Sequence, residues 1–215
     1  MIFPSITPNG CWQSKLGDIH MGCTLDSEEF NRYVKLARSL KQVHGTTILT
    51  DKDYRHCEQS GDGLFSRQQD VALVVRTADC VPVHATDGEG MLMLHAGWRG
   101  TRSGLIKRLP EFLNPRNTKV VIGPSIHAEN YEVDRDFYEP WLEQDPKIER
   151  WLSPQVTGTS KRRFDLRALV SQQLRDVGVG QVQMVPVCTF ASTLPSYRRE
   201  KNRKRSIYNY MYLKP

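Results

Sequence analysis

Runs of apolar, largely β-branched side chains mark the expected strands of this chain. Residues 71–77 (VALVVRT) and 46–51 (TTILTD) have the composition typical of strands. A further strand is predicted over 118–126, which ends at Gly123-Pro124, and another over 181–190.

Apolar positions that recur with a helical period predict the helices. The clearest is 164–179, where the apolar residues share one face, Asp165 can cap the start and Gly178 can end the helix. Helices are also expected over 27–40 and over 102–113, the second of them kinked at its proline.

Two apolar runs, 81–86 and 91–97, enclose the tetrapeptide DGEG and predict a β-hairpin. The Asp87-Gly88 pair favours a tight two-residue turn, because a type I′ turn requires positive φ at both central residues. Pro82 cannot donate to a ladder, so the first run is expected at a sheet edge, at a bulge or in a briefly paired stretch.

These elements predict an α+β protein. Strands and helices do not alternate as βαβ units, which disfavours a doubly wound parallel sheet. Residues 139–163 are expected to form an irregular surface segment with a short helix. The length of 215 residues favours one domain, or two small ones, with room for a substantial core. No apolar stretch reaches the ~20 residues that span a bilayer, and the N-terminus lacks a signal-peptide pattern, so a cytoplasmic protein is expected.

Cysteine usage and charge exclude several classes of protein. The five cysteines are scattered without a CxxC pair, which argues against a disulfide framework and against a closed zinc finger. The net charge is +6, and residues 197–205 hold six bases against one acid, which leaves the rest of the chain near neutral. Nucleic-acid binding is therefore not expected to be the main function, because such a run is usually a solvated face.

Cys80 directly precedes the first run of the predicted hairpin, and His95 lies near the end of the second. A two-residue turn would place them directly opposite each other, a four-residue turn would make them diagonal neighbours, and a three-residue turn would separate them. The pair is suited to a thiolate nucleophile, or to zinc if a third ligand is added and a fourth position stays open. Both side chains could also be ordinary buried residues. Asp79, beside Cys80, is a candidate base or ligand-orienting residue, or a turn residue.

The other histidines differ in their suitability for this site. His44 lies between a predicted helix and a predicted strand, a good position for a functional side chain. His84 shares the strand face of Cys80 but lies roughly 13 Å along the strand, too far to share one ion. The remaining histidines occupy polar segments and are expected to be solvated: His20, His56 and His127.

Several short motifs occur in a fixed order: LKQVHGT (40–46), DGLFS (62–66), VRTADCVPV (75–83), HAGWRGT (95–101), IGPSI (122–126), YEV (131–133), FDL (164–166) and CTF…SYRR (188–199). In this order they resemble the laccase-domain family, also called multi-copper polyphenol oxidoreductase-like proteins, which includes peptidoglycan editing factors. The resemblance runs from about residue 40 to the C-terminus, within a single laccase-domain-like domain over 1–215 whose segment 1–39 diverges. Asn130 stands where the family often has a cysteine.

The resemblance implies a mixed α/β sandwich, also compared with cysteine hydrolases, and a zinc site made by His44, Cys80 and His95. It implies a purine nucleoside phosphorylase with adenosine deaminase and methylthioadenosine phosphorylase activities. The alternatives are a copper-dependent polyphenol oxidase and a Cys–His hydrolase or amidase in peptidoglycan editing. Six histidines without an H-x-H pair do not suffice for a multicopper cluster, so zinc is expected rather than copper.

Phosphorolysis requires a cationic phosphate pocket and an aromatic surface for the purine. Arg99, Arg198 and Arg199 are the candidate phosphate ligands, and Trp98 and Tyr197 are the candidate purine contacts. The expected partners are a small-molecule nucleoside and phosphate, with no membrane and no nucleic acid.

Overall fold

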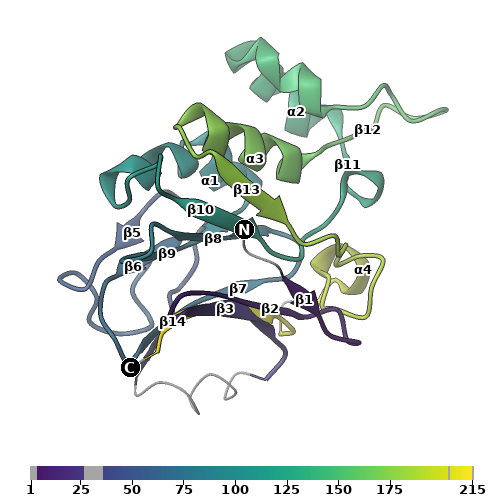
Figure 1. Cartoon of the computed structure of the whole chain (residues 1–215). Coiled ribbons are helices and arrows are strands. Elements are labelled where there is room, and N and C mark those ends of the chain that lie inside the picture. The colour runs from purple at the N-terminus through teal and green to yellow at the C-terminus, as the bar shows by residue number, and fades with distance from the viewer. Residues whose placement is uncertain (1–3, 27–35, 203, 215) are drawn as a thin grey trace.

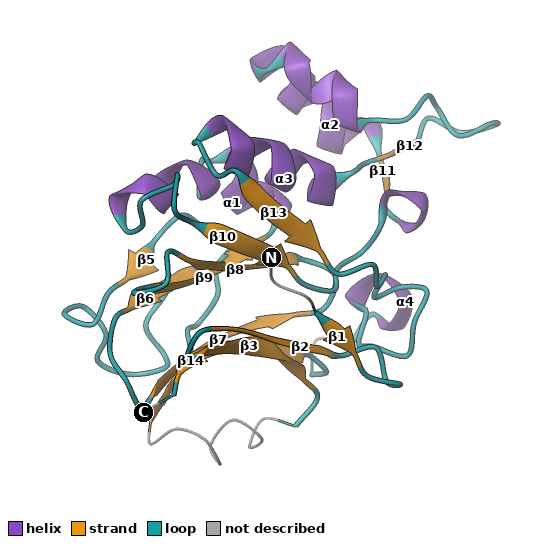
Figure 2. Ribbon diagram, in the orientation of Figure 1, coloured by secondary structure: helices purple, strands orange, loops and turns teal. Residues whose placement is uncertain are grey.

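Two six-stranded sheets face each other in the computed structural model, and helices cover the outer side of one of them (Figures 1 and 2). The structure describes residues 4–26, 36–202 and 204–214. The first sheet has the order β1-β2-β3-β14-β7-β4. Its strands are β1 (Ser5–Ile6), β2 (Trp12–Leu16), β3 (Ile19–Thr24), β14 (Ile207–Leu213), β7 (Val71–Thr77) and β4 (Leu36–Arg38).

The second sheet has the order β13-β10-β8-β9-β6-β5 and carries the predicted hairpin at its centre. Its strands are β13 (Gln181–Met184), β10 (Lys119–Ile122), β8 (Val81–Thr86), β9 (Met91–Ala96), β6 (Gly63–Ser66) and β5 (Ile48–Leu49). A small separate pair joins β11 (Glu132–Val133) to β12 (Arg162–Arg163).

The helices lie over the outer face of the second sheet, except for the short α4 (Figure 2). They are α1 (Trp98–Arg102), α2 (Arg135–Gln144), α3 (Leu166–Asp176) and α4 (Tyr197–Glu200), with 3-10 turns at Ile106–Glu111, Ala128–Asn130 and Pro146–Trp151. In the described part of the chain, no helix is both long enough and apolar enough to cross a bilayer.

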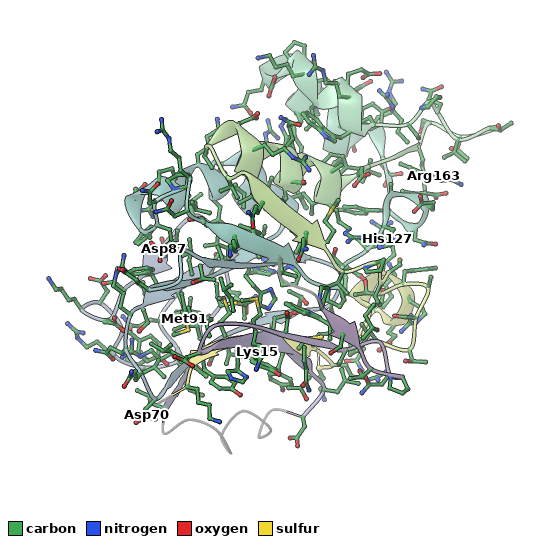
Figure 3. All side chains as sticks on the ribbon, in the orientation of Figure 1. Lys15, Asp70, Asp87, Met91, His127 and Arg163 are labelled. Carbon is green, nitrogen blue, oxygen red and sulfur yellow. The ribbon has the colours of Figure 1, made fainter. Side chains whose placement is uncertain are left out.

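The second sheet is buried on both faces, which explains the continuous apolar runs of its central strands. Met91 lies between the two sheets (Figure 3), and Met93 packs in the same cluster of side chains. Leu92 and Leu94 instead pack in the cluster that includes residues of the helices. Successive side chains of a strand point to opposite faces. Because each face meets a covering layer, β9 has no polar side until it reaches His95.

The predicted fold class is confirmed, together with most of the predicted elements. Strand β7 has the predicted bounds, and α3 begins after Asp165, whose carboxylate accepts the Ala168 N–H at 2.9 Å. Such a cap stabilises a helix by ~1 kcal/mol. Gly178, with φ +98°, follows the end of the helix as expected.

The predictions for three segments need correction. The helix expected over 27–40 is wrong at Leu36–Arg38, which form β4 and pair in parallel with β7; residues 27–35 lie outside the described residues. The helix expected over 102–113 is divided by Gly104, whose φ is +92°, into the end of α1 and a 3-10 turn that contains the proline. Residues 139–163 are more helical than expected, because α2 begins earlier and a 3-10 turn follows it.

Of the three alternatives for Pro82, the sheet edge is wrong, because β8 is an interior strand, whereas the brief pairing is found. Pro82 lies one residue beyond the last pair between β8 and β10, Val83 with Ile122, and its carbonyl accepts the Gly123 N–H at 3.0 Å. The missing N–H therefore falls where that ladder has ended, which is why an interior strand tolerates the proline.

His84 is a fully buried histidine between the two sheets. Its Nε2 lies 3.2 Å from the Gly22 carbonyl oxygen of β3, and its Nδ1 lies 3.3 Å from the Val121 carbonyl oxygen of β10. Burial lowers the pKa of His84 to about 4, although the two carbonyl groups oppose the shift. The ring is thus neutral at physiological pH and unrelated to the Cys80 cluster.

We expect His84 to make the fold sensitive to acid. Between its unfolded pKa near 6.5 and its folded pKa of about 4, the unfolded chain binds a proton that the folded chain does not. This difference lowers the free energy of unfolding by up to about 3 kcal/mol as the pH falls through that interval. Urea unfolding at several pH values measures the loss. His84→Gln should be less stable at pH 7 but should lose less stability on acidification; equal slopes for variant and wild type would refute the assignment.

Candidate active site and metal centre

The hairpin register brings Cys80 next to His95. Val81 pairs with Ala96 and Thr86 with Met91, so the turn has four residues rather than the two that Asp87-Gly88 suggested. The Asp87 carboxylate accepts the N–H groups of Glu89 and Gly90, which stabilises the longer turn. The same pairing places His95 opposite Pro82 and makes it a diagonal neighbour of Cys80, on one face of the sheet.

His44 joins this pair from a different part of the chain. The ligand atoms of His44, Cys80 and His95 all lie within 4.8 Å of one another, with 3.8 Å between the Cys80 Sγ and the His44 Nε2. The two imidazole rings meet edge to face with 4.8 Å between centroids. His44 adopts a left-handed backbone with φ 61°, which turns the loop before β5 back over the hairpin end.

The glycines of HAGWRG make room for this loop. A Cβ at Gly97 would lie 2.6 Å from the His44 Cδ2, and a Cβ at Gly100 would lie 2.6 Å from the Gly45 carbonyl oxygen. Neither position tolerates a side chain without displacing the loop that carries His44.

Asp62 connects two of the three cluster residues and has no role assigned from the sequence. Its buried carboxylate lies 2.8 Å from the His95 Nδ1 and accepts backbone N–H groups from Val43, His44 and Gly45. Burial raises the pKa of Asp62, but the hydrogen bonds from His95 and from the backbone outweigh it and hold the pKa below its ordinary value. Asp62 is the first residue of the DGLFS motif, and this motif was the only feature of the sequence that could have indicated a role for Asp62.

The thiol and the imidazole stabilise each other's charged forms. Burial raises the pKa of the Cys80 thiol, but His95 and His44 lower it to about 6. For His95, burial lowers the pKa, but Cys80 and Asp62 raise it to about 9. Cys80 is therefore a thiolate at neutral pH, and its charge is available to a metal ion or to an electrophile.

The donor set fits zinc. Two imidazoles and one thiolate are typical ligands of catalytic zinc sites that keep a fourth position open. The bond lengths of tetrahedral zinc separate its sulfur and nitrogen ligands by about 3.5 Å, near the spacing of Cys80 and His44. The carboxylate of Asp62 accepts from the Nδ1 of His95 and leaves Nε2 for the ion, an arrangement common around zinc. Among the described residues, this is the one group of His, Cys, Asp and Glu side chains that could hold a metal.

The cluster lies in the wall of a cavity of about 940 Å³, near the upper end of the usual range for small-molecule sites. Trp98, Tyr131 and Tyr197 contribute aromatic surface to it. Burial and the nearby Cys80 raise the pKa of the Tyr131 hydroxyl above its ordinary value. Tyr131, in the YEV motif, was another residue without an assigned role.

The predicted residues around the cluster have different environments. Asp79, with φ 103°, accepts the Thr189 hydroxyl at 2.6 Å and the Arg198 N–H at 2.6 Å, so both carboxylate oxygens are hydrogen-bonded within the protein. Its carboxylate holds the loop of Thr189 and the helix α4 beside Cys80. Asp79 is therefore suited to positioning these segments around the cavity.

Of the three predicted phosphate ligands, two line the cavity and one does not. Arg99 stacks over Trp98 at 4.5 Å, and Arg198 stacks over Tyr131 at 5.2 Å; both line the cavity. Arg199 instead donates to the carbonyl groups of its own loop at Thr189, Phe190, Ser192 and Leu194. The structure thus gives Arg199 a loop-bracing role away from the cavity.

Comparison with known proteins supports the motif resemblance. The model of a family described as multi-copper polyphenol oxidoreductase laccase matches residues 24–213, which begins well before residue 40. A purine nucleoside phosphorylase of Rickettsia conorii is 30% identical over 167 residues, which cover 74% of this chain and 69% of that protein. One of Aquifex aeolicus is 32% identical over 169 residues, which cover 77% and 76%. A protein of Neisseria meningitidis of known structure, 21% identical, aligns with a TM-score of 0.82 over 100% of this chain and 99% of its own.

Proposed function

We propose that this chain, which belongs to the multi-copper polyphenol oxidoreductase laccase family, is a zinc-dependent purine nucleoside phosphorylase. The observation that carries the proposal is the His44, Cys80 and His95 cluster in a cavity that also holds aromatic rings and arginines. The relatives named purine nucleoside phosphorylase, at 30% and 32% identity, support the same reaction. Adenosine deamination and methylthioadenosine phosphorolysis belong to the proposal as further reactions of this cavity.

In phosphorolysis, a phosphate oxygen bonds to C1′ of the ribose while the bond between C1′ and the purine breaks. Arg99 and Arg198 line the cavity and are suited to holding the phosphate, because guanidinium groups bind phosphate oxygens in pairs. The rings of Trp98, Tyr131 and Tyr197 line the cavity and are suited to contacting the purine. Zinc held by His44, Cys80 and His95 would act as a Lewis acid toward the cavity. Asp62 keeps the Nδ1 proton of His95 in place.

The alternative of a multicopper oxidase has less support. Electron transfer from a polyphenol to oxygen needs a histidine-rich copper cluster in addition to a cysteine-containing site. The chain has six histidines, and His84 is enclosed between two carbonyl groups of the sheets. A Cys–His hydrolase remains the second candidate, because the low pKa of Cys80 suits a nucleophile as well as a zinc ligand.

The proposal predicts that the zinc-loaded protein releases hypoxanthine from inosine only when phosphate is present. The expected second product is ribose 1-phosphate, because phosphate replaces the purine at C1′. Chromatography of the purine and an enzymatic assay of the sugar phosphate measure both products, with arsenate as an alternative acceptor. Release of hypoxanthine at the same rate without phosphate would indicate hydrolysis, and the absence of turnover with every purine nucleoside would refute the proposal.

A further inference from the structure

The cavity wall carries more positive charge than one phosphate requires. Six cationic side chains line it against a single carboxylate, that of Asp79. Both oxygens of that carboxylate are already hydrogen-bonded to Thr189 and Arg198. The cationic side chains of the lining thus outnumber its carboxylates by six to one. They are Lys41, Arg76, Arg99, Arg198, Lys201 and Arg205.

These six side chains form two sets. The inner pair, Arg99 and Arg198, lies over the rings of Trp98 and Tyr131, and both charges act on the Tyr131 hydroxyl. Lys201 instead lies over Tyr197, at 5.7 Å from the ring centroid. We call the other four, Lys41, Arg76, Lys201 and Arg205, the basic rim. Arg205 is ion-paired with Glu200 at 3.1 Å, whereas within the described residues no ion pair involves Lys41 or Arg76.

The backbone holds the rim in place. The Gln42 side chain accepts the Arg76 N–H at 2.7 Å and donates to the Arg76 carbonyl at 2.7 Å, which ties the segment of Lys41 to the end of β7. The pairing of Ile207 with Thr77 brings the residues before β14, including Arg205, alongside the same strand end. Segments distant in sequence thus present their charges at one side of the cavity.

We propose that the basic rim binds a second anionic group on the substrate, so that the protein acts on nucleoside 5′-phosphates in preference to nucleosides. This inference rests on the proposed phosphorolysis. The inner pair suffices for the attacking phosphate, and a neutral nucleoside would leave the rim without a ligand group. A 5′-phosphate lies at the end of the nucleotide remote from the base, so it requires cations other than the two that lie over Trp98 and Tyr131.

The reaction on a nucleotide is balanced as it is on a nucleoside. An oxygen of inorganic phosphate bonds to C1′, the bond from C1′ to the purine nitrogen breaks, and the electron pair leaves with the purine. The proton of the phosphate hydroxyl ends on the purine. The sugar product carries phosphate at both C1 and C5.

A comparison of kcat/KM for inosine 5′-phosphate and for inosine, offered as competing substrates, tests the inference. For the zinc-loaded wild type at low salt, we expect kcat/KM to favour the nucleotide at least about tenfold, because charged hydrogen bonds to phosphate are the strong ones. In Lys41→Gln/Arg76→Gln this preference should fall about tenfold, through the KM of the nucleotide. Added salt should reduce the preference of the wild type, because the rim is exposed. The matched control is Lys52→Gln/Arg67→Gln, which removes the same charge from exposed positions outside the cavity and should keep the preference.

The outcomes separate the inference from the function on which it rests. Turnover of inosine with no preference for the nucleotide would overturn the inference and leave phosphorolysis intact. Calorimetric binding of inosine 5′-phosphate that depends on the rim, without cleavage of either compound, would support the anion site and overturn phosphorolysis. Displacement of the nucleotide by an equimolar single-stranded oligonucleotide would overturn the inference in favour of a nucleic-acid surface.

Discussion

Cys80→Ala should abolish tight zinc binding and lower the rate of phosphorolysis roughly 10³-fold. The thiolate is one of three ligands, and two imidazoles alone bind zinc weakly at neutral pH. Losing the metal removes several kcal/mol of charge stabilisation in the transition state, which corresponds to roughly 10³-fold in rate. Elemental analysis of the purified variant and initial rates with inosine and phosphate measure the two effects.

A matched control comes from another cysteine of the same chain. Cys57 is exposed and lies outside the cavity, so Cys57→Ala should keep both zinc and turnover. Circular dichroism and thermal unfolding establish that the Cys80 variant is folded. Full zinc content and wild-type rates in Cys80→Ala would refute the metal-site assignment.

Thiol labelling separates the metal centre from the hydrolase alternative. A zinc-bound thiolate should resist iodoacetamide until a chelator removes the ion, after which Cys80 should react quickly because its thiol pKa is about 6. Rapid labelling of Cys80 in protein that holds a full equivalent of zinc would instead favour a free Cys–His dyad.

The elements that sequence predicts well are those whose pattern and partners are local. The α3 helix carries its own cap at Asp165 and its own end at Gly178, and the β8–β9 hairpin joins neighbouring runs. The predicted two-residue turn was wrong, because the Asp87 carboxylate accepts the N–H groups of Glu89 and Gly90 and so stabilises a four-residue turn. An Asp-Gly pair in the sequence does not distinguish between these two turn lengths.

The missed elements depended on distant partners or on weaker signals. Leu36–Arg38 form a strand because they pair with β7, a contact that no local pattern reveals. Strands β2 and β3 were also not predicted. They are joined by a two-residue Gly17-Asp18 turn, with Leu16 paired to Ile19. That turn type is a recognised hairpin signal, but three of the five residues of β2 beside it are polar, namely Gln13, Ser14 and Lys15.

The site shows the same division between local and distant contacts. Two of the three turn lengths considered place Cys80 and His95 on one face, because strand geometry fixes which side chains share a face, and the four-residue turn of the structure is one of them. His44 required the motif resemblance, since its contact with Cys80 spans 36 positions of the chain. Asp62 reaches His95 across 33 positions, and an isolated carboxylate in a loop gives no sign of its partners.

Asp62→Asn should lower zinc affinity and kcat/KM by about 10- to 100-fold, the usual cost of losing a hydrogen-bond partner behind a zinc-bound histidine. One Asp62 oxygen serves both the His95 Nδ1 and the His44 N–H, and the other serves the N–H groups of Gly45 and Val43. An amide supplies only one oxygen, so one of these pairs would face an NH₂ group. Each buried donor left without an acceptor costs ~1–3 kcal/mol of stability.

The Asp62 effect must be distinguished from a general loss of stability. Chelator competition measures zinc affinity directly, and NMR of the imidazole nitrogens of His95 reports which nitrogen carries the proton. Asp165→Asn is the matched control, because asparagine also caps helices and Asp165 lies outside the cavity. If Asp62 acts by positioning His95, its variant should change zinc affinity and the His95 nitrogen signals together, whereas Asp165→Asn should change neither. A purely structural role would lower the unfolding temperature of Asp62→Asn but leave the zinc affinity of the folded protein unchanged.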